Sequence, residues 1–481
     1  MAYLSHALSG SLTGPAKLAA VTKLLDKLTQ DLESPSLQSQ ERDAALEELK
    51  VYGRDPSYAD PLFTKEGIET LSKFAFDSNS DTTARNALRV LCNALLLKPP
   101  TRQTFVDLGN APKASERLKN DNLDDEFLVS RLLLLTTYVT GLDLPQLIEQ
   151  HQLADSIVQN LSRHAARASA QPSATGKAGP MEEMALAETL KLLFNVTNFA
   201  KNHINAFDAT LPHIATLLCS HPLPKTSTPL DTTFSLLFNA LLNLDLSTPT
   251  AQSALYPPAE PTRVVDRLVD LLDPAMKAYT DTALDQSVAP LVCALSVVYE
   301  HAPEPARAAV QARLLPTEED RKLVLGKTDT LPSRMLRNWT NALAPQFRSA
   351  VAHLYFDLSG KDAGKFIENV GYGYASGFLF ENSIPVPPGA VEGAAAGAGG
   401  EGGEASGSRR PVNPITGQFL DEEKFEELPE MTMEEKEREA ERLFVLFERL
   451  KQTGVVSVQN PVETAMQQGR IEELPDDEES D

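Results

Sequence analysis

Apolar residues recur along this chain at the three- and four-residue spacing of amphipathic helices, and strand-like alternation is nearly absent. Leu and Ala dominate the apolar set and aromatic residues make up only 6% of the chain, which favours helix packed on helix. Helices joined by short polar turns predict an all-α chain of stacked repeats. The expected helices are Pro15–Thr29, Gln40–Tyr52, Thr64–Phe76, Asp81–Leu97, Asp125–Thr140, Glu182–Asn198, Thr232–Leu244, Arg263–Leu272, Thr282–Glu300, Arg334–Ala344 and Gln346–Leu358.

A short segment recurs within these helices. It reads VLCNALL at 90–96, LLFNVTN at 192–198 and LLFNALL at 236–242. The asparagines of the last two copies are 44 residues apart, within the roughly 40–47-residue period of armadillo and HEAT repeats. The first two copies are 102 residues apart, which fits two repeats, and SRLLLLTT (130–137) lies where the intervening copy is expected. We therefore predict an armadillo/HEAT-type superhelix over residues 1–384.

Asparagine at a fixed place in a buried helix needs a reason, because it lowers helix propensity and its amide must be hydrogen-bonded if buried. On the innermost helix of each repeat, the amide could offer one donor and one acceptor to the backbone of a bound peptide or helix. Alternatively, each asparagine ties a neighbouring loop inside the array. Both interpretations stay open for Asn93, Asn195, Asn239 and Asn243.

Three stretches interrupt the helical pattern. Residues 164–181 and 221–230 are expected to be loops, and the Gly/Ala/Glu-rich segment 385–414 a flexible linker. Residues 415–470 form the predicted C-terminal segment, followed by an acidic, disordered tail over 471–481.

The C-terminal segment contains one strong helix signal over residues 433–453. Thr432 and Glu435 form a capping box, and Gly454 is a suitable stop. One face of this helix is apolar, so we expect it to dock either on the helical array or on a partner. The partner-contact candidates on this face are Leu443, Phe444 and Phe447.

The charge and the cysteines limit the class of protein. The formal net charge is −23, which argues against a nucleic-acid partner because phosphate binding needs clustered basic residues. The three cysteines, Cys92, Cys219 and Cys293, lie in apolar runs without metal-ligand or redox spacing, so we interpret them as reduced core residues. The start of the chain lacks a signal-peptide pattern and no apolar run is long enough to span a bilayer. We expect a cytoplasmic protein without an integral membrane segment.

No catalytic or cofactor motif is evident. The segment GKDAGKF (360–366) has one residue too few between its glycines for a phosphate loop, and Phe366 stands where Ser or Thr would bind Mg²⁺. The eight histidines show no metal-ligand spacing. We therefore expect no enzymatic activity, no cofactor and no metal.

One basic stretch stands out against the acidic whole. It is either a solvated face, the commoner case, or a docking site for an acidic segment of this chain or of a partner. Its members are Arg321, Lys322, Lys327, Arg334, Arg337 and Arg348.

Several motifs in a fixed order resemble the synembryn family, also called resistance to inhibitors of cholinesterase-8 proteins. They are ALRVLCNALL (87–96), SRLLLLTT (130–137), ETLKLLFNVT (188–197), QSVAPLVCAL (286–295), EHAPEPARAAVQARLLP (300–316), KFIENVGYGYASGFL (365–379), NPITG (413–417) and MTMEEKEREAERLFVLFERL (431–450). The resemblance extends from about residue 41 to residue 474, and the Ala/Pro-rich loops and short linker indicate a fungal member.

The resemblance implies a chaperone and receptor-independent guanine nucleotide exchange factor for heterotrimeric G-protein α subunits (Gα), GDP-bound or nucleotide-free. It implies that an armadillo/HEAT groove holds the C-terminal helix of Gα away from the GTPase core, which weakens GDP binding. The C-terminal helix of the exchange factor braces the GTPase domain. We expect a monomer whose contact with membranes runs only through Gα.

The resemblance also assigns individual residues. Lys50 and Arg54 match basic groove positions that meet the carboxyl end of the Gα helix, and the four asparagines match groove asparagines, with Phe238 beside one of them. Phe444 and Phe447 match the bracing helix. Ser406 and Ser408 lack the acidic context of the linker phosphorylation sites in animal members, which puts phosphorylation control in doubt. The alternative is a general armadillo adaptor without exchange activity.

Overall fold

The computed structural model describes residues 12–170, 179–224, 226–230, 233–387 and 410–423. These residues are overwhelmingly helical, and their one bridge between extended segments pairs Val412 with Phe419. The all-α prediction is confirmed. Residues up to Asp421 belong to one compact unit, and a second unit begins at Glu422.

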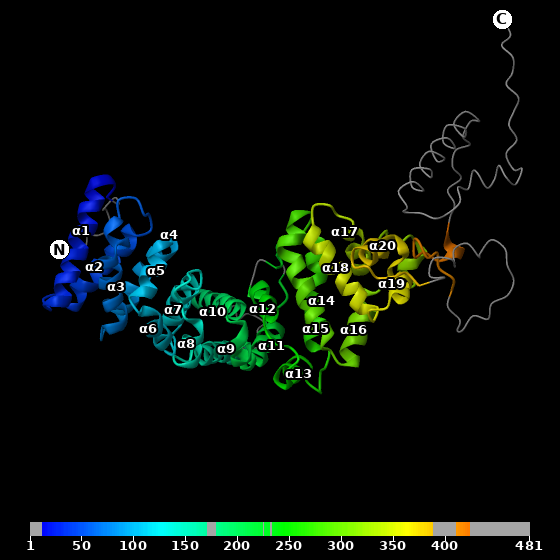
Figure 1. Ribbon diagram of the computed structural model, residues 1–481, viewed down its shortest axis with the longest axis horizontal. Coiled ribbons are helices and arrows are strands. Elements are labelled where there is room, and N and C mark those ends of the chain that lie inside the picture. Colours follow the sequence, from blue (N-terminus) through cyan, green and yellow to red (C-terminus); the bar gives the residue numbers. More distant parts are fainter. Residues whose placement is uncertain (1–11, 171–178, 225, 231–232, 388–409, 424–481) are drawn as a thin grey trace, which may run out of the picture. The chain divides into compact units, whose positions relative to one another are not determined.

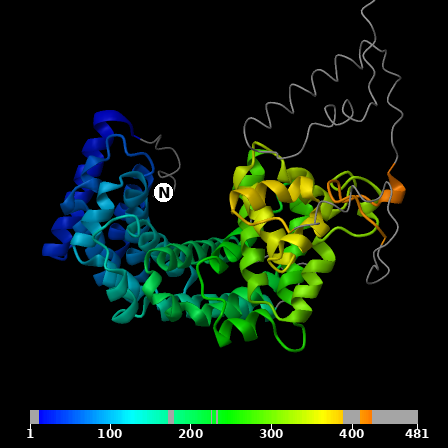
Figure 2. The same ribbon diagram turned by 45° about the vertical axis from the view of Figure 1, so that its right-hand side comes forward.

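The helices of the first unit form two columns. In column I, each helix packs against the next one of the column, as Figures 1 and 2 show for neighbouring helices. Column I consists of α2 (Ser39–Tyr52), α4 (Asp81–Leu97), α7 (Leu123–Thr136), α10 (Pro180–Phe199), α12 (Thr233–Leu241), α15 (Ala289–Glu300) and α18 (Pro345–Leu358).

Column II runs beside column I, and each of its helices packs both on its own neighbours and on the column I helix that follows it in sequence. Column II consists of α1 (Gly14–Glu33), α3 (Lys65–Asp77), α6 (Asn110–Arg117), α9 (Leu153–Ala170), α11 (Leu211–Ser220), α14 (Arg263–Ala278) and α17 (Leu331–Trp339). This pairwise stacking buries a continuous Leu- and Ala-rich core, as expected for a helical repeat protein.

A third helical segment, of 6 to 11 residues, precedes most pairs. Three-helix units of this kind are an armadillo feature. These third segments are α5 (Pro100–Asp107), α8 (Leu144–Glu149), the 3₁₀ helix η2 (Lys201–Thr210), α13 (Pro249–Leu255) and α16 (Glu304–Leu314). The last helices are α19 (Ala363–Val370) and α20 (Tyr372–Glu381). Further short segments are the 3₁₀ helices η1 (Asp60–Phe63), η4 (Asp320–Lys322) and η7 (Leu420–Glu422) and the π-helical turn η3 (Leu284–Val288).

The segment 130–137 forms the end of α7 and its C-cap residue, Thr137. It lies between α4 and α10 in column I, which is the place expected for the intervening repeat copy.

The loop expected over 164–181 starts later than predicted. Helix α9 continues through Ala170, and His164 is buried between α7 and α10, where its Nε2 lies 2.8 Å from Glu126 Oε1. Because Arg167 donates to Nδ1 at 3.0 Å, Nε2 carries the proton and donates to Glu126.

Two negative findings concern the described residues only. Among them, no helix is both long and apolar enough to cross a membrane. Likewise, the described part of the chain contains no group of three His, Cys, Asp or Glu side chains arranged to hold a metal ion.

All three cysteines are unpaired, and burial raises the pKa of the Cys92 thiol to about 12, so this thiol is inert at neutral pH.

Candidate partner-binding surface

The predicted asparagines lie at the carboxyl-terminal turns of column I helices. Asn93 on α4 donates from Nδ2 to the Lys50 carbonyl oxygen at the end of α2, at 3.3 Å. Asn195 on α10 donates to Thr137 Oγ1 at the end of α7, at 2.9 Å. The amides thus link the ends of successive column I helices.

Asn243, just beyond α12, repeats this link, because its Nδ2 donates to the carbonyl oxygen of Phe194 on α10 at 3.1 Å. Asn239 is half-buried, and its side chain makes no hydrogen bond within the described residues. The two interpretations of the asparagines are therefore compatible: the Nδ2 donors tie the array together, whereas the Oδ1 acceptors of Asn93, Asn195 and Asn243 receive no hydrogen bond from described residues and are free to accept one.

The structure adds an apolar component that the sequence reasoning missed. The exposed fractions of Leu96, Tyr138 and Phe199 are 51%, 58% and 52%. Leu96 and Phe199 lie in the last turns of α4 and α10, and Tyr138 lies just beyond the end of α7. Leu96 lies three residues after Asn93, and Phe199 four residues after Asn195, so each shares a helix face with its asparagine. The three- and four-residue spacing of Leu96 and Phe199 from these asparagines could have identified both residues in the sequence. We call the carboxyl-terminal ends of α2, α4, α7, α10 and α12, with these amides and apolar side chains, the amide row.

Basic side chains lie at the first end of the amide row. Lys50 is half-buried in the last turn of α2 and pairs with Glu47. Arg54 is exposed, and no described side chain pairs with its guanidinium group. Farther along, the Arg102 guanidinium lies 5.8 Å from the centre of the Tyr138 ring. This end of the row can therefore attract a negatively charged group.

The placement of Phe238 differs from the prediction. Its side chain on α12 is only 1% exposed, because it packs in the core between the two columns. A buried ring stabilises the array and offers no surface to a partner, so Phe238 is removed from the candidate surface.

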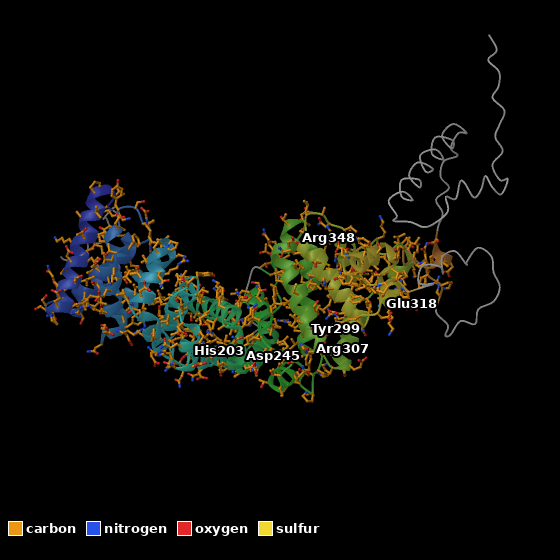
Figure 3. The ribbon with its side chains drawn as sticks, viewed as in Figure 1. His203, Asp245, Tyr299, Arg307, Glu318 and Arg348 are labelled. Atoms are coloured by element: carbon orange, nitrogen blue, oxygen red, sulfur yellow. The ribbon has the colours of Figure 1, made fainter. Side chains whose placement is uncertain are left out.

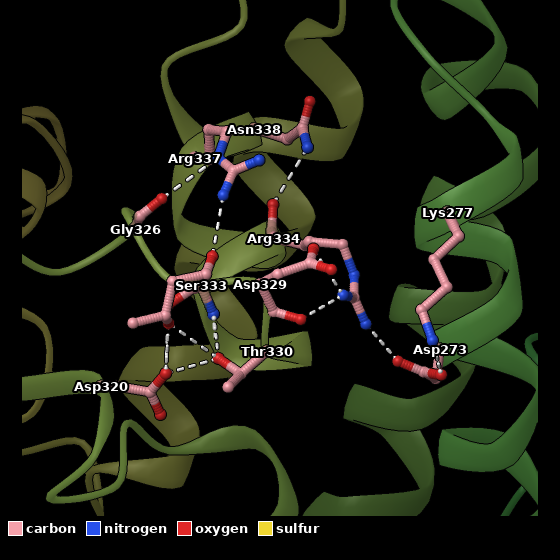
Figure 4. Close-up of polar contacts among 11 residues, drawn as sticks. Asp273, Lys277, Asp320, Gly326, Asp329, Thr330, Ser333, Arg334, Arg337 and Asn338 are labelled. Atoms are coloured by element: carbon pink, nitrogen blue, oxygen red, sulfur yellow. Dashed lines mark hydrogen bonds and ion pairs between the residues drawn. The ribbon is translucent and has the colours of Figure 1, made fainter.

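The predicted basic stretch is not a uniform exposed face. Figure 4 shows Arg334 between Asp329 and Asp273, and its side chain is only 8% exposed. Arg337 donates to the carbonyl oxygens of Gly326 at 3.1 Å and Thr328 at 2.8 Å. These two arginines hold the loop before α17 in place.

The other members of the stretch differ from one another. Arg321 donates to backbone carbonyl groups, Lys322 pairs with Glu319 at 2.7 Å, and Lys327 is exposed. Arg348 lies on α18 (Figure 3), half-buried, with Nε buried without a partner. Docking of an acidic segment on this basic stretch remains a prediction. Arg334 cannot take part in it, because its side chain is buried.

A buried carboxylate organises the same loop. Asp320 accepts hydrogen bonds from the Thr317 backbone at 2.9 Å, from Thr328 Oγ1 at 2.6 Å and from Ser333 Oγ at 3.2 Å; Figure 4 includes its contact with Thr330. Burial alone would raise the pKa of Asp320, but hydrogen bonds from Thr328 and Thr330 outweigh it and lower the pKa. The carboxylate therefore stays charged at neutral pH.

The second predicted contact cannot be placed. The helix expected over 433–453, with Leu443, Phe444 and Phe447, lies outside the described residues, as do the acidic tail and most of the linker.

Comparison with known proteins supports one family. The family description "Guanine nucleotide exchange factor synembryn" matches residues 45–470. Chaperone Ric-8A of Macaca fascicularis is 26% identical over 450 residues, covering 85% of this chain and 81% of the relative. The same protein of Bos taurus is 25% identical over 472 residues, covering 90% and 85%. A synembryn-like chaperone of Schizosaccharomyces pombe is 32% identical over 166 residues, covering 33% and 31%.

Two solved structures also show similarity. A designed armadillo repeat protein is 16% identical, with 57% of this chain and 99% of that chain covered and a TM-score of 0.36. An engineered protein is 15% identical, with 78% and 82% covered and a TM-score of 0.39. Since the family description spans most of the sequence, the chain belongs to the synembryn family of guanine nucleotide exchange factors.

Proposed function

We propose that this protein is a receptor-independent guanine nucleotide exchange factor and folding chaperone for G-protein α subunits, acting as a monomer in the cytoplasm. Membership in the synembryn family carries the proposal. The nucleotide is bound by the partner, so the protein needs no catalytic centre of its own.

In the proposed complex, the C-terminal helix of Gα lies along the amide row. Exposed apolar side chains suit the apolar face of an amphipathic helix, and free Oδ1 acceptors can accept hydrogen bonds from its polar side chains. Lys50 and Arg54 lie at the end of the row where the terminal carboxylate of such a helix would find positive charge. The helix at 433–453 would hold the GTPase domain of the same Gα.

Exchange follows from differential binding. A surface that binds the C-terminal helix only when it has left the GTPase core favours the open Gα over the closed, GDP-bound one. To shift that equilibrium from about 1:99 to 99:1, the open state must be bound about 10⁴-fold more tightly. The same preference would stabilise a Gα that has not completed folding.

The decisive measurement is GDP release. Adding the purified protein to Gα loaded with fluorescent GDP should accelerate release and yield a stable complex on size-exclusion chromatography only without added nucleotide. A Gα lacking its last residues is the control and should show no acceleration. A stable complex without acceleration would favour the adaptor alternative. If the protein neither accelerates GDP release nor forms a complex, the proposal is contradicted.

Charge reversal at the basic end of the amide row tests the orientation of the bound helix. Arg54→Glu should weaken binding of a Gα C-terminal peptide about tenfold, because attraction to the carboxylate becomes repulsion. Asn195→Ala should weaken the same binding by removing an acceptor. Fluorescence anisotropy of a labelled peptide measures both. Lys327→Glu is the control, because it reverses the charge of another exposed residue away from the row. Unchanged affinity in both variants would place the helix elsewhere.

A further inference from the structure

A buried lysine lies beside the basic end of the amide row. Helix α1 packs on α2 (Figure 1), and Lys17, in the first turn of α1, is only 5% exposed. Lysine side chains are almost never buried without a partner, because taking an ammonium group out of water is costly. Nothing in the helical pattern of the sequence distinguishes Lys17 from an exposed lysine, so its burial is a finding of the tertiary structure.

The partner of Lys17 is the residue that follows Arg54. Lys17 Nζ donates to the Asp55 carbonyl oxygen at 2.7 Å and lies 3.5 Å from Asp55 Oδ2. The Asp55 side chain is 66% exposed, so a buried donor holds a residue at the surface. Lys17 therefore fixes both the backbone and the carboxylate of the residue next to Arg54.

Residues 50–58 link the end of α2 to the next helical segment, and we call them the Arg54 turn. Other contacts hold the two ends of this turn. At its start, Asn93 Nδ2 donates to the Lys50 carbonyl oxygen at 3.3 Å. Toward its end, Ser57 N donates to Asp55 Oδ1 at 3.0 Å. The contact with Lys17 supplies the link from the middle of the turn to α1.

Asp55 places a negative charge next to a residue that is proposed to bind a carboxylate. Hydrogen bonds from the Ser57 backbone and side chain, followed by the charge of Lys17, lower the pKa of Asp55, so its carboxylate is charged at neutral pH. If this charge were not balanced, it would attract the Arg54 guanidinium group and repel a negatively charged ligand group. Lys17 balances it from the buried side, and Arg54 stays exposed.

We propose that Lys17 is a positioning residue for Arg54: by holding Asp55 and balancing its charge, Lys17 keeps the Arg54 guanidinium group available to a ligand carboxylate. This inference rests on the proposed function, in which Arg54 meets the terminal carboxylate of the Gα helix. Because Lys17 is buried, it does not touch that ligand itself. Its effect reaches the ligand only through Asp55 and the Arg54 turn.

The preference for a free carboxylate tests this role. Fluorescence anisotropy compares the binding of a labelled Gα C-terminal peptide to the full-length protein with that of the same peptide ending in an amide. The wild type should bind the free acid about tenfold more tightly, since a hydrogen bond to a charged group contributes about this factor. Lys17→Met should lower this preference to about twofold or less, with unchanged affinity for the amidated peptide. Lys17→Arg keeps the charge and the donors and should retain the preference.

Arg42→Met is the matched control, because it also replaces a basic residue by methionine and breaks a link between α1 and α2. Arg42 Nε lies 2.7 Å from Asp31 Oδ2, at the other end of the two helices. The Asp31 side chain is only 1% exposed, so Arg42→Met should lower the urea midpoint more than Lys17→Met does. It should nevertheless keep the preference for the free acid. An equal loss of preference in both variants, or a wild-type preference in Lys17→Met, would overturn the proposal.

Hydrogen exchange without any partner distinguishes this inference from the proposed function. The Ser57 amide, which donates to Asp55, should exchange faster in Lys17→Met than in the wild type. Unchanged exchange would refute the hold on Asp55, whatever the protein binds. A wild type that binds both peptides equally would refute the inference and leave the proposed function standing. A wild type that binds neither the peptide nor Gα would overturn the proposed function and the role of Lys17 with it.

Discussion

Replacing Leu96 and Phe199 together by alanine is expected to weaken binding of a Gα C-terminal peptide about 100-fold. Both side chains are half exposed in the free protein and adjoin asparagines of the amide row. If the peptide covers them, each truncation removes about 1–2 kcal/mol of apolar burial, and aromatic anchors are frequent hot spots of interfaces. Acceleration of GDP release should fall in parallel, since both depend on holding the same helix.

The control is Leu343→Ala. Leu343 is 58% exposed, like Leu96, but lies in the loop between α17 and α18, away from the amide row. Circular dichroism should be unchanged in all variants, because none of these side chains is buried in the core. A double variant that binds the peptide within about twofold of the wild type would show that the apolar part of the row is not the contact surface.

Asp125→Ala is expected to lower the free energy of unfolding by about 3–5 kcal/mol, since removing one partner of a buried ion pair leaves the other charge unpaired. The Asp125 side chain is 1% exposed and accepts from Arg85 Nε, from an Arg117 guanidinium nitrogen, both at 3.0 Å, and from Asn120 Nδ2 at 2.9 Å. It thereby joins α4, α6 and α7, and α4 and α7 belong to the amide row.

Asp124→Ala is the matched control. Asp124 is the preceding residue of the same helix, but its ion pair with Arg89 is one-third exposed on both sides, so its loss should change stability by less than about 1 kcal/mol. Urea unfolding monitored by circular dichroism measures both variants. Equal effects of the two substitutions would contradict the assigned difference in burial.

The stabilisation of the fold by the Asp125 carboxylate depends on pH in a predictable direction. Burial would raise the pKa of Asp125, but hydrogen bonds from Arg85 and Asn120 and the charge of Arg117 lower it overall. The stabilisation is therefore present above the unfolded-state pKa of about 4 and is lost as the pH falls through the lower folded-state pKa. The difference in stability between the wild type and Asp125→Asn should shrink only below about pH 4.

The architecture could be predicted from the sequence in large part. Helix periodicity placed all of column I, and the repeated asparagine segment predicted the order of α4, α7, α10 and α12. The helices α6, α9 and α11 of column II were missed, as were α5, α8, α13, α16, α19 and α20. Of these, α5, α8 and α13 span only 6 to 8 residues, too few for a periodic pattern to be recognised.

The candidate surface was predicted less completely. Sequence identified Asn93 and Asn195 but not that each donor is used by the preceding helix while the acceptor stays free. It assigned Phe238 and Arg334 to surfaces, although both are buried. Residue type does not reveal burial when a side chain can serve equally well in a core or at an interface.

By itself, the sequence determined what depends on local spacing: the helical class, the repeat and the place of the asparagines. Only the tertiary structure decided what depends on contacts between distant segments. It brought residues 413–417 onto 371–373 and Arg321, where the sequence predicted the junction of the linker 385–414 and the C-terminal segment 415–470. No local pattern encodes that contact, because most of its hydrogen bonds join backbone groups, which are nearly the same in every residue type.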